Sequence, residues 1–325
     1  MADLAAAAGA RRYWWIWAAV LPIVLWTVIR LFGLERGYPL VPILAFTPYA
    51  AVVALLVAGI ALALRNWAAA VVAGLAAFCL AAAVLPRAIG DETAPAAGHE
   101  TLSVLAANIH HGTADPDALI ALVDRLHPDL LSIEELTPGF VRKLRAAGIE
   151  ERLPNAIVSI PRFGPYAAGT GLFTSLPMRK LKEGPQLIFR LPRASLELAD
   201  GRRVRVVGVH TFPPQEHMVG EWKASLESLP SAGSGPPWVL AGDFNATLDH
   251  AELRDVLARG YRDAAEVAGK GLEPTWPQGW DVPPFITIDH VLADDRLGIV
   301  EFSVEDLPGS DHHAVHAVLA LPDRR

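Results

Sequence analysis

Three short polar motifs of this chain combine the residue types that attack on a phosphate ester requires. Gly242-Asp243-Phe244-Asn245, Ile288-Asp289-His290 and Ser310-Asp311-His312 each follow or end an apolar run. Such runs predict buried strands, and α/β proteins build their sites where strands end. Carboxylates, an amide and an imidazole delivered to one place are the groups needed for metal-assisted attack on a phosphoryl group.

Two earlier strand ends add further candidates. Asn108 directly follows the apolar residues 102–107, and Glu134-Glu135 follows residues 130–133. Adjacent carboxylates point to opposite faces of a continuing strand, so only one of them can enter a site. We expect Glu135 to be a ligand for a hard cation, which prefers oxygen donors, and Glu134 to be an exposed charge. Asn108 alone is an ordinary turn residue.

The spacing of the remaining polar residues predicts how they are used. Asp243 and Asn245 are two residues apart, so an extended local path points both side chains the same way. Asp289 interrupts an apolar run, where a carboxylate is costly unless it is paired, and His312 is the partner that we expect. His210 closes another predicted strand, and a lone histidine there is more often structural than catalytic.

The elements that would position these residues begin after a very apolar N-terminal part. Residues 13–32, 41–64 and 67–85 are apolar segments of about the ~20 residues that cross the hydrocarbon core of a bilayer. Buried core helices or a cleaved signal peptide are the alternatives, but three such segments in succession favour neither. We therefore predict that residues 1–87 form a membrane anchor with three transmembrane helices.

Arginines beside these segments bear on orientation. Arg11, Arg12 and Arg65 would lie on one side of the membrane, and Arg30, Arg36 and Arg87 on the other. The numbers are equal, so the positive-inside rule decides weakly. The Arg11-Arg12 pair ahead of the first span favours a cytoplasmic N-terminus. Three crossings then predict that the C-terminal part is extracytoplasmic.

Charge divides the chain at the same place. Residues 1–87 carry six arginines against two carboxylates, a net charge of +4, so the remainder must carry −11 of the chain's net −7. Proteins that bind nucleic acid tightly need a basic surface, because release of counterions supplies much of the affinity. The acidic remainder therefore disfavours nucleic acid as a partner. The single cysteine, Cys79, excludes a disulfide within the chain and says nothing about compartment.

Residues 88–100 have the small, polar composition of a linker, and strands alternate with helices from residue 101 to the C-terminus. This alternation predicts an α/β domain at residues 101–325, built as a layered sheet with helices outside. The expected strands are 101–107, 130–133, 171–174, 187–191, 195–198, 204–209, 238–241, 286–293 and 314–320, and the expected helices are 115–126, 137–147, 216–229 and 251–258.

The order of these motifs resembles the endonuclease/exonuclease/phosphatase, or deoxyribonuclease-I-like, superfamily. The matching residues, spread over about residues 101–321, are Asn108, Glu135, Asp243, Asn245, Asp289, Asp311 and His312, with His210 where many members keep a histidine. The resemblance implies a four-layer sandwich of two mixed β-sheets flanked by helices. Glu134 departs from the pattern, since members usually have glutamine there, and this alters the charge beside the metal site.

The resemblance also implies roles. Glu135, with Asn108 and Asp311, would hold Mg²⁺ or Mn²⁺.

The catalytic roles fall on five further residues. Asp243, assisted by Asn245, would orient or deprotonate the attacking water. His312, positioned by Asp289, would act on the phosphate or the water. His210 would hydrogen-bond a phosphate oxygen or help the leaving group. Which residue is the general base stays open.

The three spans and the acidic domain favour a lipid-linked phosphate as the substrate. The whole architecture resembles actinomycete membrane-anchored phosphatases associated with vancomycin and teicoplanin resistance. That resemblance implies hydrolysis of undecaprenyl pyrophosphate, the carrier lipid of cell-wall synthesis. A membrane-tethered extracellular nuclease is the alternative enzyme, and a non-enzymatic sensor of lipid head groups is a third reading.

Overall fold

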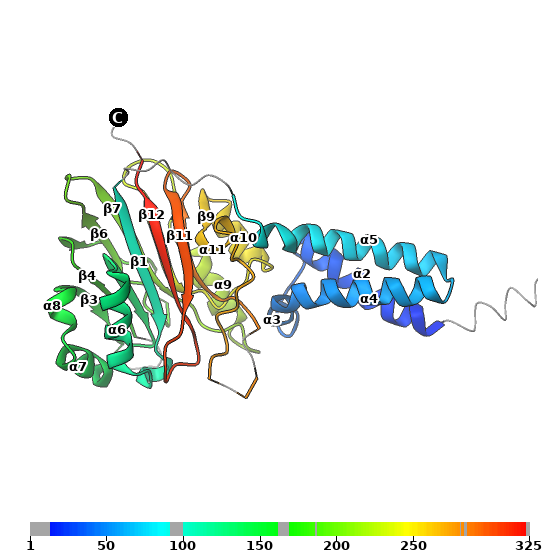
Figure 1. Cartoon of the computed structure of the whole chain (residues 1–325), viewed down its shortest axis with the longest axis horizontal. Helices are drawn as coiled ribbons and strands as arrows, with labels where there is room; N and C mark the ends of the chain where they lie inside the picture. Colours follow the sequence, from blue (N-terminus) through cyan, green and yellow to red (C-terminus); the bar gives the residue numbers. More distant parts are fainter. Residues whose placement is uncertain are drawn as a thin grey trace, which may run out of the picture. The chain divides into compact units, whose positions relative to one another are not determined.

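The computed structural model describes residues 14–91, 100–161, 169–185, 187–279, 281–282 and 285–322. They form two compact units: one holds the N-terminal helices with the short segment Asp249–Ala251, and the other holds the rest of the chain from Arg87 onward. Figure 1 shows that both β-sheets belong to the second unit. Residue 13, the predicted start of the first span, and residues 92–99 of the predicted linker lie outside the described residues.

The first unit is built from long apolar helices. Its elements are α2 (Trp14–Phe32), α3 (Leu40–Ile43), η1 (Leu44–Phe46), α4 (Thr47–Ala63), α5 (Trp67–Val84) and η2 (Leu85–Ala88). They give three stretches of 19, 24 and 22 residues with mean hydropathies of 1.9, 2.3 and 2.5. Each stretch is long and apolar enough to cross a membrane.

The inside of this unit is closely packed, and its outside is apolar. Ala61 and Ala73 are fully buried between the helices, and such small residues let helix backbones approach closely. Leu21, Leu55 and Phe78 point outward with 68%, 66% and 71% of their surface exposed. Contact of so much apolar surface with water is unfavourable, whereas contact with lipid is not. The helices therefore indicate a membrane anchor.

The second unit contains two six-stranded sheets. The first has the order β11-β12-β1-β2-β4-β3 and the second the order β5-β6-β7-β8-β10-β9. The strands of the first sheet are β1 (Thr101–Asn108), β2 (Leu130–Glu134), β3 (Asn155–Ser159), β4 (Thr170–Thr174), β11 (Gly298–Glu305) and β12 (Ala314–Ala320). Those of the second are β5 (Met178–Lys180), β6 (Arg193–Glu197), β7 (Arg203–His210), β8 (Trp238–Asp243), β9 (Tyr261–Asp263) and β10 (Asp289–Asp294).

Each sheet has one parallel pair at its centre. β1 runs parallel to β2 and β7 runs parallel to β8, while the other neighbours are antiparallel. Both sheets are therefore mixed. The carboxyl ends of the two strands in a parallel pair lie at the same edge of their sheet. This places the ends of β1 and β2 together, and likewise those of β7 and β8.

The core follows from the alternation of side chains along β1. Val104 and Ala106 pack against Val239 of β8 and other residues of the second sheet, so the two sheets lie face to face. Leu105 and Ala107 point the other way, into a cluster with helices on the outer face of the first sheet. The helices of this unit are η3 (His110–Gly112), α6 (Pro116–Leu126), α7 (Pro138–Ala146), α8 (Ile149–Arg152), α9 (Val219–Glu227), α10 (Ala251–Leu257) and α11 (Ala264–Val267).

The predicted fold class is confirmed: two mixed sheets with helices follow three long apolar helices. The predicted strand at residues 187–191 is wrong, because these residues form bends without a strand partner. Pro185 and Pro192 stand on either side of it, and proline has no N–H to donate to a sheet. The predicted strand at 286–293 starts later, at Asp289. Strands β3, β5, β9 and β11 were not predicted.

Candidate active site

Central strands of both sheets begin or end at the predicted site residues. β1 ends at Asn108, β7 at His210 and β8 at Asp243, and β10 starts at Asp289. The register pairs Asp243 with His210 across the parallel β7–β8 contact and with Asp289 across the antiparallel β8–β10 contact. Sheet topology thus brings together residues that lie far apart in the chain.

The side chains of Asp243, Asp289 and His312 form a buried cluster. His312 Nδ1 lies 3.0 Å from Asp289 Oδ2, and His312 Nε2 lies 4.0 Å from Asp243 Oδ2. One ligand atom from each of the three lies within 4.8 Å of the others. The predicted Asp289–His312 pair is therefore present, and its free ring nitrogen faces the second carboxylate.

Burial and charge shift the protonation of this cluster. Burial raises the pKa of the Asp243 carboxyl above its usual range, and Asp289 raises it further, while His312 lowers it. Burial alone would lower the pKa of His312, but Asp289, Asp243 and Asp311 outweigh burial and raise it. The arrangement favours a protonated imidazole among carboxylates. It also gives Asp243 the proton affinity that a general base needs near neutral pH.

Two amide side chains hold Asp243 in place. Asn108 Nδ2 and Asn245 Nδ2 each donate to Asp243 Oδ2 at 3.1 Å, and the Asn245 backbone N–H donates to Asp243 Oδ1 at 2.8 Å. Asn245 adopts a positive φ of 45°, which lets its side chain fold back toward Asp243. Asp243 is therefore oriented from both sheets.

Glu135 and Asp311 lie among histidines. Glu135 Oε1 accepts from Asn108 Nδ2 at 3.4 Å, which joins it to the cluster around Asp243. Asp311 Oδ1 is buried and has no hydrogen-bond partner among the residues that the structure describes, and His110 Nδ1 is 3.6 Å away. A desolvated carboxylate oxygen that accepts no hydrogen bond is suited to a cation.

Glu134 overturns an expectation, because it is fully buried rather than exposed. Glu134 lies on the same face of β2 as Leu130, which packs in the core between the two sheets, and Ser132 Oγ on that face donates to Glu134 Oε1 at 2.5 Å. A Cβ atom at Gly242 would lie 2.0 Å from Val209 O and 2.7 Å from Glu134 Oε1. Only glycine therefore fits at position 242, next to the Glu134 side chain. Burial raises the pKa of Glu134 well above its usual range and favours the uncharged acid. Glu134 therefore resembles the neutral glutamine of the family pattern more closely than its charge suggested.

His210 is buried, with its ring 4.4 Å from that of Phe189. Burial, with smaller contributions from His312 and His111, lowers the pKa of His210 to about 3. The imidazole is therefore neutral at physiological pH. Its Nδ1 is buried and has no hydrogen-bond partner in the described part of the chain.

Sequence reasoning missed His110 and His111, which follow Asn108 after one intervening residue, Ile109, and open η3. Both have left-handed backbone conformations, with φ of 43° and 54°, and such strain in non-glycine residues is concentrated at functional sites. The His111 backbone N–H donates to Glu135 Oε2 at 2.7 Å, and its Nδ1 lies 3.0 Å from the same oxygen. Two adjacent histidines, one residue beyond a strand-ending asparagine, were the available signal.

The donor set fits the divalent cation that the sequence predicted. Carboxylate and amide oxygens are the ligands that Mg²⁺ and Mn²⁺ accept, and Glu135, Asn108 and Asp311 supply them. Among the described residues, Asp243, Asp289 and His312 form a group whose ligand atoms lie near enough to one another to hold a metal ion. Both sets contain the oxygen donors that a hard cation requires.

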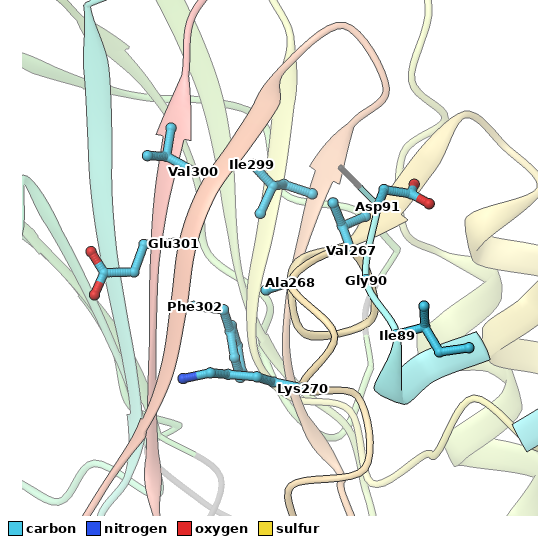
Figure 2. Close-up of a pocket in the computed structure, with 10 residues that line it drawn as sticks. All are labelled: Ile89, Gly90, Asp91, Val267, Ala268, Lys270, Ile299, Val300, Glu301 and Phe302. Carbon is cyan, nitrogen blue, oxygen red and sulfur yellow. The ribbon is translucent and has the colours of Figure 1, made fainter. Parts of the chain in front are cut away.

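A hollow elsewhere in the second unit is separate from this centre. It has a volume of about 380 Å³ and lies between the residues that follow η2, the end of α11 and strand β11 (Figure 2). Ile89, Val267 and Phe302 give it an apolar lining, with Lys270 at one side. None of the predicted site residues lines it.

A family model described as the endonuclease/exonuclease/phosphatase family matches residues 105–312. This match covers more than half of the chain and includes every residue of the candidate site. No curated protein matches the chain.

Solved structures with a similar fold cover the second unit. An endonuclease/exonuclease/phosphatase from Beutenbergia cavernae aligns with a TM-score of 0.51 at 18% identity, over 68% of this chain and 72% of that one. A protein described in the same way from Bacteroides vulgatus aligns at 0.53 and 17%, over 68% and 99%. D. rerio TDP2 complexed with single-strand DNA product aligns at 0.52 and 19%, over 68% and 99%. At these identities the likeness establishes the fold alone.

Proposed function

The chain belongs to the endonuclease/exonuclease/phosphatase family, and from this premise we propose that it is a membrane-anchored, divalent-metal-dependent phosphatase that acts outside the cytoplasm on a lipid-linked pyrophosphate. The substrate that we propose is undecaprenyl pyrophosphate. Its hydrolysis would recycle the cell-wall carrier and contribute to glycopeptide resistance. The observation that carries the proposal is a buried Asp243–Asp289–His312 centre in a chain that begins with three membrane-length helices.

The membrane helices support a lipid substrate by confinement. A lipid pyrophosphate keeps its hydrocarbon tail in the bilayer and presents its phosphates at the surface, where a tethered enzyme meets it at high local concentration. The net charge of −11 after residue 87 disfavours a long nucleic acid, which would be repelled by an acidic surface. Both features favour the same substrate class.

The site residues supply the steps of hydrolysis. Asn108, Glu135 and Asp311 would hold a divalent cation, which polarises a phosphoryl oxygen and offsets developing negative charge. Asp243, oriented by Asn108 and Asn245, accepts a proton from the attacking water.

The two histidines have different protonation and therefore different tasks. His312, kept positive by Asp289, presents its Nε2–H to a phosphoryl oxygen. His210 is neutral and donates one hydrogen bond without adding charge. An anhydride suits this centre, because the departing phosphate is already an anion and needs no strong general acid.

Phosphate release from purified full-length protein tests the substrate. The assay compares undecaprenyl pyrophosphate, phosphatidylinositol phosphates and plasmid DNA, with and without Mg²⁺, and uses Asp243→Asn as the inactive control. We expect Mg²⁺-dependent release from the prenyl pyrophosphate and no nicking of the plasmid. Nicking without phosphate release would instead establish the membrane-tethered nuclease.

Cysteine labelling tests the proposed orientation. Cys79 lies within α5, so a Cys79→Ala background leaves an introduced cysteine as the only thiol. Ser231 is exposed in the second unit, and Ser231→Cys should react with a membrane-impermeant maleimide in intact cells. Reaction only after the cells are lysed would place the centre in the cytoplasm and exclude the extracytoplasmic role.

A further inference from the structure

A short segment within the connection from α11 to β10, Thr275–Gln278, contacts Asp289 at the start of β10 and the loop that carries Asp311. Thr275 is fully buried, and its Oγ1 donates to Asp289 Oδ2 at 2.6 Å. The same carboxylate oxygen lies 3.0 Å from His312 Nδ1. Asp289 therefore stands between the threonine hydroxyl and the imidazole.

The direction of the threonine hydrogen bond is fixed by its surroundings. Thr275 Oγ1 accepts from the backbone N–H groups of Ile288 and Asp289 at 3.1 Å and 3.3 Å. A hydroxyl has two lone pairs and one hydrogen, so its hydrogen is left for Asp289. The carboxylate thus receives one donor from Thr275 and one from His312, and both bonds favour a single orientation of Asp289.

Trp276 forms a hydrogen bond to the carboxylate of Asp311. Its indole Nε1–H donates to Asp311 Oδ2 at 3.3 Å, and its ring packs edge-on against Phe285 at 5.7 Å. The other oxygen, Asp311 Oδ1, has no hydrogen-bond partner within the described ranges of the chain. One oxygen of Asp311 is anchored and the other is available.

Backbone hydrogen bonds connect the segment to the loop before β12. His313 N donates to Thr275 O at 2.8 Å, and Gln278 N donates to Asp311 O at 2.6 Å. The loop that carries Asp311 and His312 is therefore bonded to the segment on both sides. Consecutive side chains of the segment then reach the two carboxylates.

We propose that Thr275 and Trp276 are positioning residues of the phosphoesterase centre. Thr275 sets the orientation of Asp289 and, through it, the ring of His312. Trp276 sets the orientation of Asp311 and thereby its competence to bind a divalent cation. Removal of such supporting hydrogen bonds typically costs about 10- to 100-fold in activity or metal affinity. The inference concerns the centre itself and holds for any phosphate ester that the enzyme hydrolyses.

Turnover of Thr275 variants is the first test. In full-length protein with saturating Mg²⁺ and whichever of undecaprenyl pyrophosphate, phosphatidylinositol phosphate and plasmid DNA the wild type hydrolyses, Thr275→Val should lower kcat by about 10- to 100-fold with little change in KM. Thr275→Ser, which keeps the hydroxyl, should retain most of the wild-type kcat. Thr275→Ala replaces the valine variant if that variant does not fold. Thr287→Val is the matched control, since Thr287 Oγ1 donates to Glu273 O outside the centre, and it should retain wild-type kcat.

Metal binding without substrate is the second test. Titration with Mn²⁺, followed by electron paramagnetic resonance, should show about 10-fold weaker binding in Trp276→Phe. Trp238→Phe removes an indole that lies over Arg205 instead, and it should leave Mn²⁺ affinity unchanged. Wild-type Mn²⁺ affinity in Trp276→Phe would overturn the role of Trp276. A serine variant as impaired as the valine variant, or a valine variant with wild-type kcat, would overturn that of Thr275.

Discussion

Strand β10 contributes to two buried histidine–carboxylate pairs that resemble each other in composition. Asp289 pairs with His312, and the next residue, His290, pairs with Asp263. Neighbouring residues of a strand point to opposite faces, so one pair faces the candidate active site and the other faces away from it. Both are almost completely buried.

The pairs differ in what the second ring nitrogen meets. His290 Nδ1 lies 2.7 Å from Asp263 Oδ2 and His290 Nε2 lies 2.8 Å from Ala246 O, so both nitrogens face acceptors and the whole ring is satisfied. His312 uses only Nδ1 in this way, and its Nε2 stands 4.0 Å from Asp243 and 3.9 Å from Asp311. The first pair is closed and the second is open. A closed pair can only stabilise the fold, whereas an open pair keeps a donor for a substrate.

Removal of divalent cations should show the largest difference between the two pairs, because it should abolish turnover at the open pair and leave the closed pair unaffected. We expect chelation, or Glu135→Ala in the presence of Mg²⁺, to abolish turnover, because the charge that polarises the phosphoryl group is lost. The closed pair requires no cation, so the thermal midpoint of the chelated protein should change little. Phosphate-release assays and thermal scans of the same samples measure both. Full activity of Glu135→Ala would remove this residue from the metal site.

Substitutions of His312 in the open pair, and of Asp243 beside it, should affect the rate of turnover far more than the stability of the fold. His312→Ala and Asp243→Asn should each lower kcat by about 10²- to 10⁴-fold, the usual contribution of one general acid–base group. Asp243→Asn should leave the thermal midpoint near that of the wild type, whereas His312→Ala removes the imidazole partner of the buried Asp289, to which Thr275 still donates, and should lower the midpoint moderately. A large loss of stability with normal kcat would show that the open pair is structural as well.

The closed pair should show the reverse pattern. His290→Ala leaves Asp263 buried without its partner, which typically costs about 3–5 kcal/mol of folding free energy. The folded molecules should keep wild-type kcat, since His290 does not face Asp243 or His312. Thermal unfolding and turnover measured on the same preparation decide this. Normal stability with a strongly reduced kcat would assign His290 to the centre.

The pH dependence of stability gives a smaller effect that sharpens the comparison. Burial lowers the pKa of His290, but Asp263 and Ala246 outweigh it and raise the pKa above the ordinary value near 6.5. The stabilisation is therefore fully present below about pH 6.5 and is lost as the pH rises through the folded-state pKa, by at most about 1.4 kcal/mol per pH unit. Asp263→Asn should flatten this slope above pH 6.5 in unfolding measurements. An unchanged slope would mean that other groups cause it.

Burial explains which strands could be predicted. All eight strands with a neighbour on each side were predicted in type and approximate position, although β10 starts three residues late. The four that were missed, β3, β5, β9 and β11, are the edge strands of the two sheets. Edge strands are less buried, and β3 alternates only between partly buried and exposed residues. Their apolar signal is therefore weak, and only pairing with a neighbour defines them.

The residues of the candidate site also differ in whether the sequence could predict them. Asp243 and Asp289 were predictable because each ends or interrupts an apolar run, and His312 because it stands in a polar motif just before the apolar run 314–320. The burial of Glu134 was not, because a local pattern cannot tell that a second sheet covers that face of β2. Thr275 was missed because a threonine in a loop has many ordinary uses.

Local patterns of hydrophobicity and polarity were thus sufficient for the membrane-length helices, the inner strands and the residue types of the centre. These properties depend on neighbours within a few positions of the chain. Which ring nitrogen stays free, which oxygen of Asp311 lacks a partner and which carboxyl group becomes uncharged depend on atoms within about 4 Å that come from distant segments. Sheet register and packing bring those atoms together, so the chemistry of the centre was decided only by the tertiary structure.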